Sequence, residues 1–406
     1  MTETLKPRDA KDVEAAVQWA LAGGKPLEIV GQGSKRALGR PAQADLTLDL
    51  SDLTGVTLYE PEELVLSARA GTPIAEIEAL VASKGQQLAF EPMDYAAVLG
   101  AAPGRGTIGG ALAVNLSGPR RIKAGAARDH FLGFTAVSGR GETFKSGGRV
   151  VKNVTGYDLC KLMAGSWGTL AALTEVTIKV LPKPETEATL MVLGLDDAAA
   201  VNAMSIAMGS PCEVSGAAHL PAAIAARASE AGGKRAITAL RLEGVAPSIA
   251  HRRQVLAALM KPYGPVAVLE EVASGALWRG IRNATPLAAE GSSDERPLWR
   301  ISTAPTKGAE LARLASGTGA EMLYDWAGGL VWLALPPSED AGAALVRRAV
   351  EACGGHAMLV RAPAALRAAV SVFEPQDAAV AALTKRVKEG FDPKGVLNPG
   401  RMWAGV

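Results

Sequence analysis

Four glycine-rich segments crowded into the first half of the chain constrain its fold more than any other sequence feature. They read GQGSK at 31–35, PGRGTIGGALAVN at 103–115, GAARDH at 125–130 and GSWGTL at 165–170. Glycine lets the main chain turn tightly and approach a ligand with no side chain between them. We therefore expect the backbone, more than the side chains, to form a binding site in this half.

The first segment directly follows an apolar stretch, Leu27–Val30, that predicts a strand. Successive amide groups in such a turn can form a nest for a diphosphate, and a dinucleotide fits that description. A Rossmann motif would open a long helix here, yet Pro41 follows Arg36 closely and another strand-like segment comes next. Taken alone, the motif is also compatible with an ordinary tight turn.

The remaining pattern predicts an α+β protein with a second unit after a linker at 181–186. Asp9 can cap a helix that Gly23 and Gly24 end, and a second helix opens at Pro73 and runs to about Ala82. A hairpin is expected around 139–141. Further strands are expected at 46–50, 56–59, 64–70 and 173–181, and helices at 197–208, 220–231, 248–261, 308–316 and 340–353.

Charge and residue composition argue against several classes of partner. The 43 Lys and Arg residues nearly balance the 41 Asp and Glu residues, so we expect no nucleic-acid binding. No apolar run approaches the roughly 18 residues of a membrane span, which predicts no direct membrane insertion and a cytoplasmic location. Three separated cysteines and four scattered histidines predict no metal site within the chain.

The ordered motifs together resemble a known family. GxGSK, PGxGTIGGALA, NLSGPRR, GxxRDxxLG, GGRVVKNVTGYDL, GSWGTL and a terminal FDPxGVLNPGR are similar to the FAD-binding subunits of bacterial glycolate oxidases, which are vanillyl-alcohol oxidase type flavoproteins. The resemblance covers 1–185 and returns at 391–401. It implies a two-subdomain FAD-binding fold (about 1–55 and 56–185), an α+β cap domain (186–385) and a C-terminal tail (386–406) that returns to the FAD domain.

The resemblance also implies which residues contact FAD. Gly31, Gln32, Gly33, Ser34 and Lys35 would hold the pyrophosphate, and a second group of residues would line the diphosphate, the isoalloxazine ring and the adenine side. That second group comprises Gly106, Thr107, Ile108, Gly109, Gly110, Ala113, Ser117, Gly118, Gly125, Arg128, Asp129, Val176 and Ile178. For Val176 and Ile178, ordinary core positions on a strand remain the alternative.

The catalytic residues that the family resemblance implies are only partly present in this sequence. We expect non-covalent FAD, since His130 is the one histidine near the glycine segments and stands where the family pattern has an apolar residue. Arg401 is the candidate for a catalytic carboxylate clamp or a positive charge beside the flavin, with a surface arginine as the alternative. Related dehydrogenases use clustered histidines around a divalent metal, and this sequence has no such cluster.

The function implied is oxidation of a 2-hydroxy acid, with glycolate the best candidate. The expected partners are a larger FAD subunit and an iron–sulfur subunit, through which the chain could lie peripherally at the inner membrane. The missing histidines favour a substrate site in the larger partner. A self-sufficient dehydrogenase and an FAD-free scaffold remain alternatives. Four tryptophans are either partner anchors or core residues: Trp278, Trp299, Trp326 and Trp332.

Overall fold

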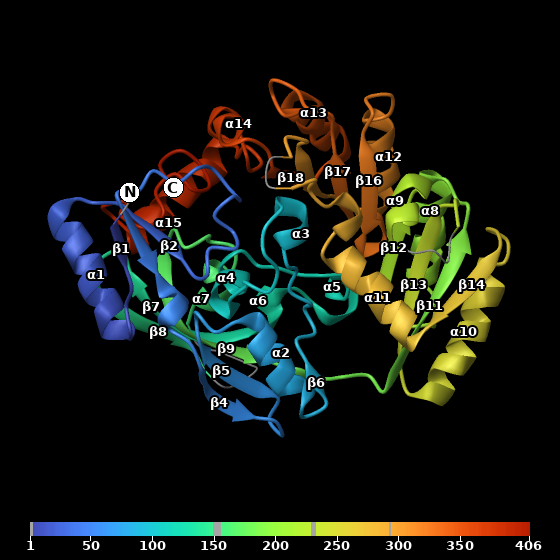
Figure 1. The fold of residues 1–406 in the computed structure, drawn as a ribbon, viewed down its shortest axis with the longest axis horizontal. Coiled ribbons are helices and arrows are strands. Elements are labelled where there is room, and N and C mark those ends of the chain that lie inside the picture. The colour runs from blue at the N-terminus through green and yellow to red at the C-terminus, as the bar shows by residue number, and fades with distance from the viewer. Residues whose placement is uncertain (1–2, 149–155, 229–232, 292–293) are drawn as a thin grey trace.

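The computed structural model describes residues 3–148, 156–228, 233–291 and 294–406. One half contains the N-terminal segments, three sheets and the C-terminal tail, and the other half is built on a single large sheet (Figure 1). The chain crosses from the first half to the second at β10 (Leu181–Pro182) and β11 (Thr186–Leu193), where the linker is expected. Part of the GGRVVKNVTGYDL motif, 149–155, lies outside the described residues.

A small parallel sheet forms the first part of the N-terminal half. Its strand order is β1-β3-β2, and the helix α1 (Ala10–Gly23) connects β1 to β2. Asp9 caps α1 as predicted, accepting hydrogen bonds from two amide groups, and Gly24 ends the helix at a φ of 61°. The strands are β1 (Glu3–Leu5), β2 (Leu27–Val30) and β3 (Leu46–Asp49), followed by a short 3-10 helix, η1 (Leu50–Asp52).

An antiparallel sheet of order β4-β5-β9-β7-β8 forms the second part. Its strands are β4 (Val56–Glu60), β5 (Val65–Arg69), β7 (Phe131–Ser138), β8 (Thr143–Gly147) and β9 (Ala171–Lys179). The predicted hairpin is the β7–β8 pair. One face packs against short helices; they are α2 (Ile74–Ala82), α4 (Ile108–Ala113), α6 (Ala127–His130) and α7 (Leu159–Met163).

The second half is an eight-stranded antiparallel sheet of order β14-β11-β13-β12-β16-β17-β15-β18. Helices cover both faces of much of this sheet, so strands such as β11 are buried on both sides. The strands are β12 (Gly216–Leu220), β13 (Ile237–Gly244), β14 (Val266–Glu270), β15 (Leu298–Ser302), β16 (Glu321–Asp325), β17 (Leu330–Ala334) and β18 (His356–Arg361). The helices are α8 (Asp197–Met208), α9 (Ala222–Ala228), α10 (Ala246–Met260), α11 (Glu271–Arg282), α12 (Gly308–Leu314) and α13 (Ala343–Cys353).

The C-terminal tail returns to the N-terminal half, as the family resemblance implies. After α14 (Ala364–Ala369), α15 (Ala378–Phe391) leads the chain back to β2, where the Leu27 amide donates to the Val396 carbonyl at 2.7 Å (Figure 1). Lys388 is buried beneath this contact and donates to the carbonyl oxygens of Thr169 and Leu397. The tail is therefore an integral part of the N-terminal half.

Buried ion pairs join the two halves of the molecule. Glu91 and Arg120 come from the N-terminal half, and Arg241 and Glu243 come from β13. Arg241 donates to both carboxylate oxygens of Glu91 at 2.9 and 3.0 Å, and Arg120 pairs with both acids. Burial opposes ionisation of Glu91, but the two guanidiniums outweigh it and lower the pKa of that carboxyl to about 2. This network should fix the large sheet against the N-terminal half.

The four tryptophans of the second half are core residues and not surface anchors. Each of Trp278, Trp299, Trp326 and Trp332 is at most 5% exposed. The indole N–H groups of Trp278, Trp299 and Trp326 donate hydrogen bonds within the protein, as where Trp299 donates to the Ala341 carbonyl. A partner-binding surface must therefore use other residues. Among the described residues, no helix is both long and apolar enough to cross a membrane.

Candidate functional site

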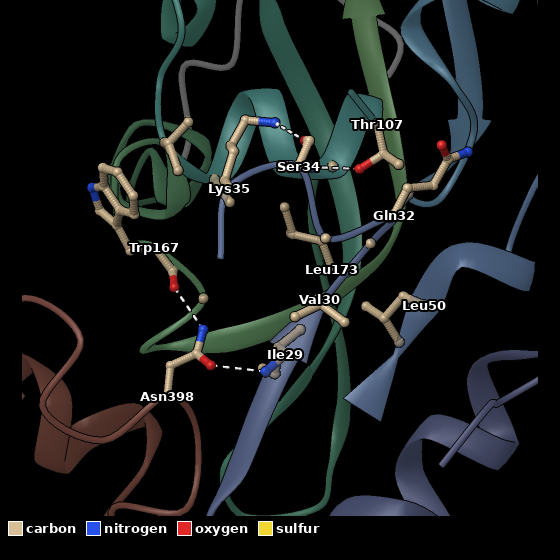
Figure 2. A pocket seen from close by; sticks show the side chains of 18 of the residues that line it. Ile29, Val30, Gln32, Ser34, Lys35, Leu50, Thr107, Trp167, Leu173 and Asn398 are labelled. Atoms are coloured by element: carbon tan, nitrogen blue, oxygen red, sulfur yellow. Dashed lines mark hydrogen bonds between the residues drawn. The ribbon is translucent and has the colours of Figure 1, made fainter. Parts of the chain in front are cut away.

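An open cleft lies where β2 ends, between the small parallel sheet and the antiparallel sheet. Its walls are the loop 31–36, the start of α4, the start of β9, the segment at Trp167 and Gly168, and two residues of the tail (Figure 2). Ligands of α/β folds commonly bind outside the carboxyl ends of parallel strands.

The loop after β2 presents unpaired amide groups to this cleft. Within the described part of the chain, the main-chain N–H groups of residues 32–35 have no hydrogen-bond acceptor. Gly33 adopts a φ of 74°, which few other residues tolerate, and a Cβ on Gly31 would lie 2.6 Å from Oγ1 of Thr107. No helix follows the loop, as expected for a turn that is not a Rossmann motif. The loop is suited to bind phosphate oxygens.

Lys35 adds a positive charge at the same wall. Its ammonium hydrogen-bonds Oγ of Ser34 at 3.3 Å and lies over Gly110 at the start of α4 (Figure 2). Burial lowers the pKa of Lys35 to about 8, although Asp94 acts in the opposite direction. An anionic ligand in the cleft would stabilise the charged ammonium and raise this pKa again.

The opposite wall, at the start of α4, differs from the loop because its amide groups are already hydrogen-bonded within the protein. The amides of Ile108 and Gly109 donate to the carbonyl oxygens of Thr72 and Ala70, and that of Gly110 donates to Thr107. Gly109 packs so closely on β5 that a Cβ would lie 2.7 Å from that of Ala70. Gly109 is therefore required by its packing on Ala70, and these three amides offer no free donor to a ligand.

Two residues of the tail complete the cleft. The Asn398 side chain accepts a hydrogen bond from the Ile29 amide at 2.8 Å and donates to the Trp167 carbonyl at 2.7 Å (Figure 2). Arg401 donates to the carbonyl oxygens of Lys35 and Arg36 at 2.7 and 3.3 Å. Burial lowers the pKa of Arg401 to about 10, with nearby Glu28 opposing the change. Asn398 therefore ties the end of β2 to the Trp167 segment, and Arg401 holds the loop.

Comparisons with known proteins agree with this geometry. Residues 3–147 match the model of a family described as an FAD binding domain. The chain is 34% identical to the glycolate oxidase subunit GlcE of Escherichia coli over 96% of this chain and 95% of that protein. The chain belongs to the GlcE family.

Other relatives share parts of the GlcE-family chain or its fold. The glycolate oxidase subunit GlcD of Bacillus subtilis is 30% identical over 47% of this chain and 39% of its own length. p-Cresol methylhydroxylase with bound substrate superposes with a TM-score of 0.72 at 14% identity, covering 98% of this chain and 88% of that one. Alkyldihydroxyacetonephosphate synthase superposes with a TM-score of 0.70 at 17% identity, covering 98% of this chain and 76% of that one. These structures support the α+β fold of the vanillyl-alcohol oxidase type.

The predicted contact residues of the GlcE-family chain fall into three groups. The first group lines the cleft: Gly31, Gln32, Gly33, Ser34, Lys35, Thr107, Gly109, Gly110, Ala113 and Arg401. The second lines a neighbouring cavity that shares Val114 and Trp167 with the cleft: Ser117, Gly118 and Arg128. The third lines neither: Gly106, Ile108, Gly125, Asp129, Val176 and Ile178.

The third group has structural contacts instead. Val176 and Ile178 are fully buried in the core, and both pair with β5 and β7 on either side of β9. Asp129 accepts a hydrogen bond from the Ala126 amide at the start of α6. FAD contacts of these residues stay a prediction.

Some cleft residues of the GlcE-family chain were missed from the sequence. Asn398 lies in the NPG motif beside Arg401, and its φ of 43° marks an unusual turn. Trp167 also has a positive φ of 58° within the fourth glycine segment. Four more lie near strand ends, where no local signal separates a cleft residue from a core residue: Leu50, Ala70, Ala171 and Leu173.

The histidines lie apart from the cleft. His130 is fully buried, and its two ring nitrogens contact the carbonyl oxygens of Ala124 and Lys179. Across the described ranges, no group of three His, Cys, Asp or Glu side chains could hold a metal ion. The free loop amides, the lysine and the close glycine contacts fit a diphosphate nucleotide such as FAD, with Gly31 to Lys35 as the residues to hold its pyrophosphate.

Proposed function

We propose that this chain is an FAD-binding subunit of a complex that oxidises a 2-hydroxy acid, with glycolate as the first candidate substrate. The observation that carries the proposal is the cleft with its free amides at residues 32–35 and the ammonium of Lys35. The similarity to the GlcE subunit over nearly the whole chain supports the reaction class. When bound, FAD supplies the acceptor of two electrons.

The complex would contain a larger FAD subunit and an iron–sulfur subunit, and it could lie at the inner membrane through them. The name of the Escherichia coli relative, a glycolate oxidase subunit, supports a multi-subunit assembly. Arg401 is proposed to act on FAD through the loop, since its guanidinium donates to the Lys35 and Arg36 carbonyl oxygens. It is therefore a positioning residue in this proposal.

Purification of the chain alone and together with its genomic neighbours tests the proposal. We expect a yellow protein with flavin absorbance near 450 nm, FAD released on acid precipitation, and glycolate oxidation by the assembled complex. A colourless chain that cannot be reconstituted with FAD would instead favour the scaffold alternative. A complex that binds FAD but oxidises D-lactate and not glycolate would change the substrate and leave the cofactor assignment intact.

A further inference from the structure

The second cavity, of about 600 Å³, lies between the two halves of the molecule. It meets the FAD-binding cleft at Val114 and Trp167, which line both spaces. On one side it is bounded by the segment 114–128 of the N-terminal half, and on the other by the large sheet and the tail. A ligand in this cavity would therefore be next to anything that extends from the cleft past Trp167.

Strand register places polar side chains of the large sheet along this cavity. Arg300 on β15 is paired with Trp332 on β17, and the next paired row joins His356, Ser302, Leu330 and Asp325 across β18, β15, β17 and β16. All of these residues line the cavity. Since alternate residues of a strand share a face, both rows face the N-terminal half.

Two guanidiniums converge in the cavity on a single indole. The Trp326 ring is fixed because its Nε1 donates to the Gly118 carbonyl at 2.9 Å. The guanidinium carbon of Arg121, from α5 (Arg121–Ala124), lies 4.3 Å from the ring centroid, and that of Arg300 lies 4.9 Å from it. A π face attracts a cation but does not neutralise its charge.

Neither guanidinium forms an ion pair within the described part of the chain. Among the described residues, no carboxylate oxygen lies within 4.0 Å of Arg121 or Arg300, and neither side chain donates a hydrogen bond. Burial lowers the pKa of both guanidiniums, and Arg300 lowers that of Arg121 further, whereas Asp129 acts in the opposite direction on Arg121 and Asp325 does so on Arg300; arginine nevertheless stays charged in proteins. Two like charges in a partly buried site repel each other, and a bound anion would relieve this repulsion.

The other titratable groups facing the cavity do not cancel this charge. Burial raises the pKa of Asp325 to about 7, so near neutral pH its carboxyl is only partly ionised. Glu374 is paired with Arg347, and Arg128 is half exposed beside Asp129. Burial lowers the pKa of His356, which keeps the imidazole mainly neutral. Asp377 caps α15 through two amide groups.

We propose that Arg121 and Arg300 form the binding site for the carboxylate of a small hydroxy acid, in the cavity that adjoins the FAD cleft. A planar guanidinium can bind a carboxylate through two parallel hydrogen bonds. The identification of the ligand as a hydroxy acid rests on the proposed function. The expected affinity for a carboxylate does not depend on that function. The chain would then carry its own substrate site, instead of depending on one in the larger partner subunit.

Oxalate is a suitable probe because it resembles glycolate but has no hydrogen on carbon to transfer. We expect calorimetry to detect oxalate binding to the wild-type chain, with a change in the flavin spectrum when FAD is present. Arg300→Met and Arg121→Met should each weaken oxalate binding at least about tenfold, in line with loss of a charge-assisted hydrogen bond. Arg300→Lys should recover part of the affinity, and the neutral amide of glycolate should not compete.

Arg348→Met is the matched control, since Arg348 is exposed on α13 and lies outside the cavity; it should bind oxalate like the wild type. Equal oxalate affinity in all variants would overturn the proposal. Loss of bound FAD in Arg300→Met at an unchanged melting temperature would also overturn it, because this result would mean that the guanidinium binds the flavin. If the wild-type chain binds no FAD, the proposed function fails, while oxalate titration of the same chain still tests this site.

Discussion

Replacement of Lys35 by methionine tests the electrostatic part of the FAD site. In the unliganded protein the pKa of Lys35 is about 8, because burial disfavours the ammonium. Between pH 7 and pH 9 the protonated fraction should fall from about 0.9 to about 0.1, while a bound diphosphate would keep the ammonium charged. The affinity of the wild-type chain for FAD should therefore be nearly full at pH 7, about half of that at pH 8, and about tenfold lower at pH 9.

The assay is titration of the apoprotein with FAD at both pH values, followed by flavin fluorescence or calorimetry. Lys35→Met should bind FAD at least about tenfold more weakly at pH 7, because a charge-assisted contact is lost, and its affinity should be nearly independent of pH. Lys84→Met, at an exposed lysine, should behave like the wild type. An unchanged affinity in Lys35→Met, together with a flat wild-type profile, would refute the reasoning.

Three further substitutions address the walls of the cleft and the contact between the halves. Gly31→Val should abolish FAD binding, seen as lost absorbance near 450 nm, because its Cβ would meet Oγ1 of Thr107 at 2.6 Å; retained flavin would contradict the close approach. Arg401→Met should weaken FAD binding by loosening the loop, without a selective loss of oxalate binding. Glu91→Gln should reduce the free energy of unfolding by about 3 kcal/mol at pH 7, since the pKa falls from 4.5 to about 2 on folding. That contribution is present above pH 4.5 and is lost as pH falls toward 2, so urea denaturation of the two proteins should converge in acid.

Local sequence signals predicted much of the N-terminal half correctly. Asp9 and Gly24 bound α1 because capping needs particular residue types at particular positions, and the β7–β8 hairpin follows from the glycines at its turn. Gly31 and Gly33 were predicted from the same kind of rule, since a tight turn after a strand leaves few alternatives to glycine.

Sequence reasoning failed where the relevant contacts join distant parts of the chain. Arg121 and Arg300 are neighbours only because the large sheet packs on the N-terminal half. Arg121 ends the NLSGPRR motif, but that motif gives no sign of its contact with the large sheet, and Arg300 lies in no motif at all. The four tryptophans could be assigned to the core only once the sheet and its covering helices were known. Asn398 was missed for the same reason, since its partners at Ile29 and Trp167 are more than 200 positions away.

The position of the tail has a consequence for how the protein is made. Arg401 and Asn398 contact the loop and β2 across sequence separations of 366 and 369 residues. A ribosome releases those residues long after β2 has emerged, so the cleft cannot be complete until residues 398–401 have been synthesised. Until then the nascent N-terminal half should remain open to chaperones, and a ligand that binds the completed cleft would stabilise the folded chain.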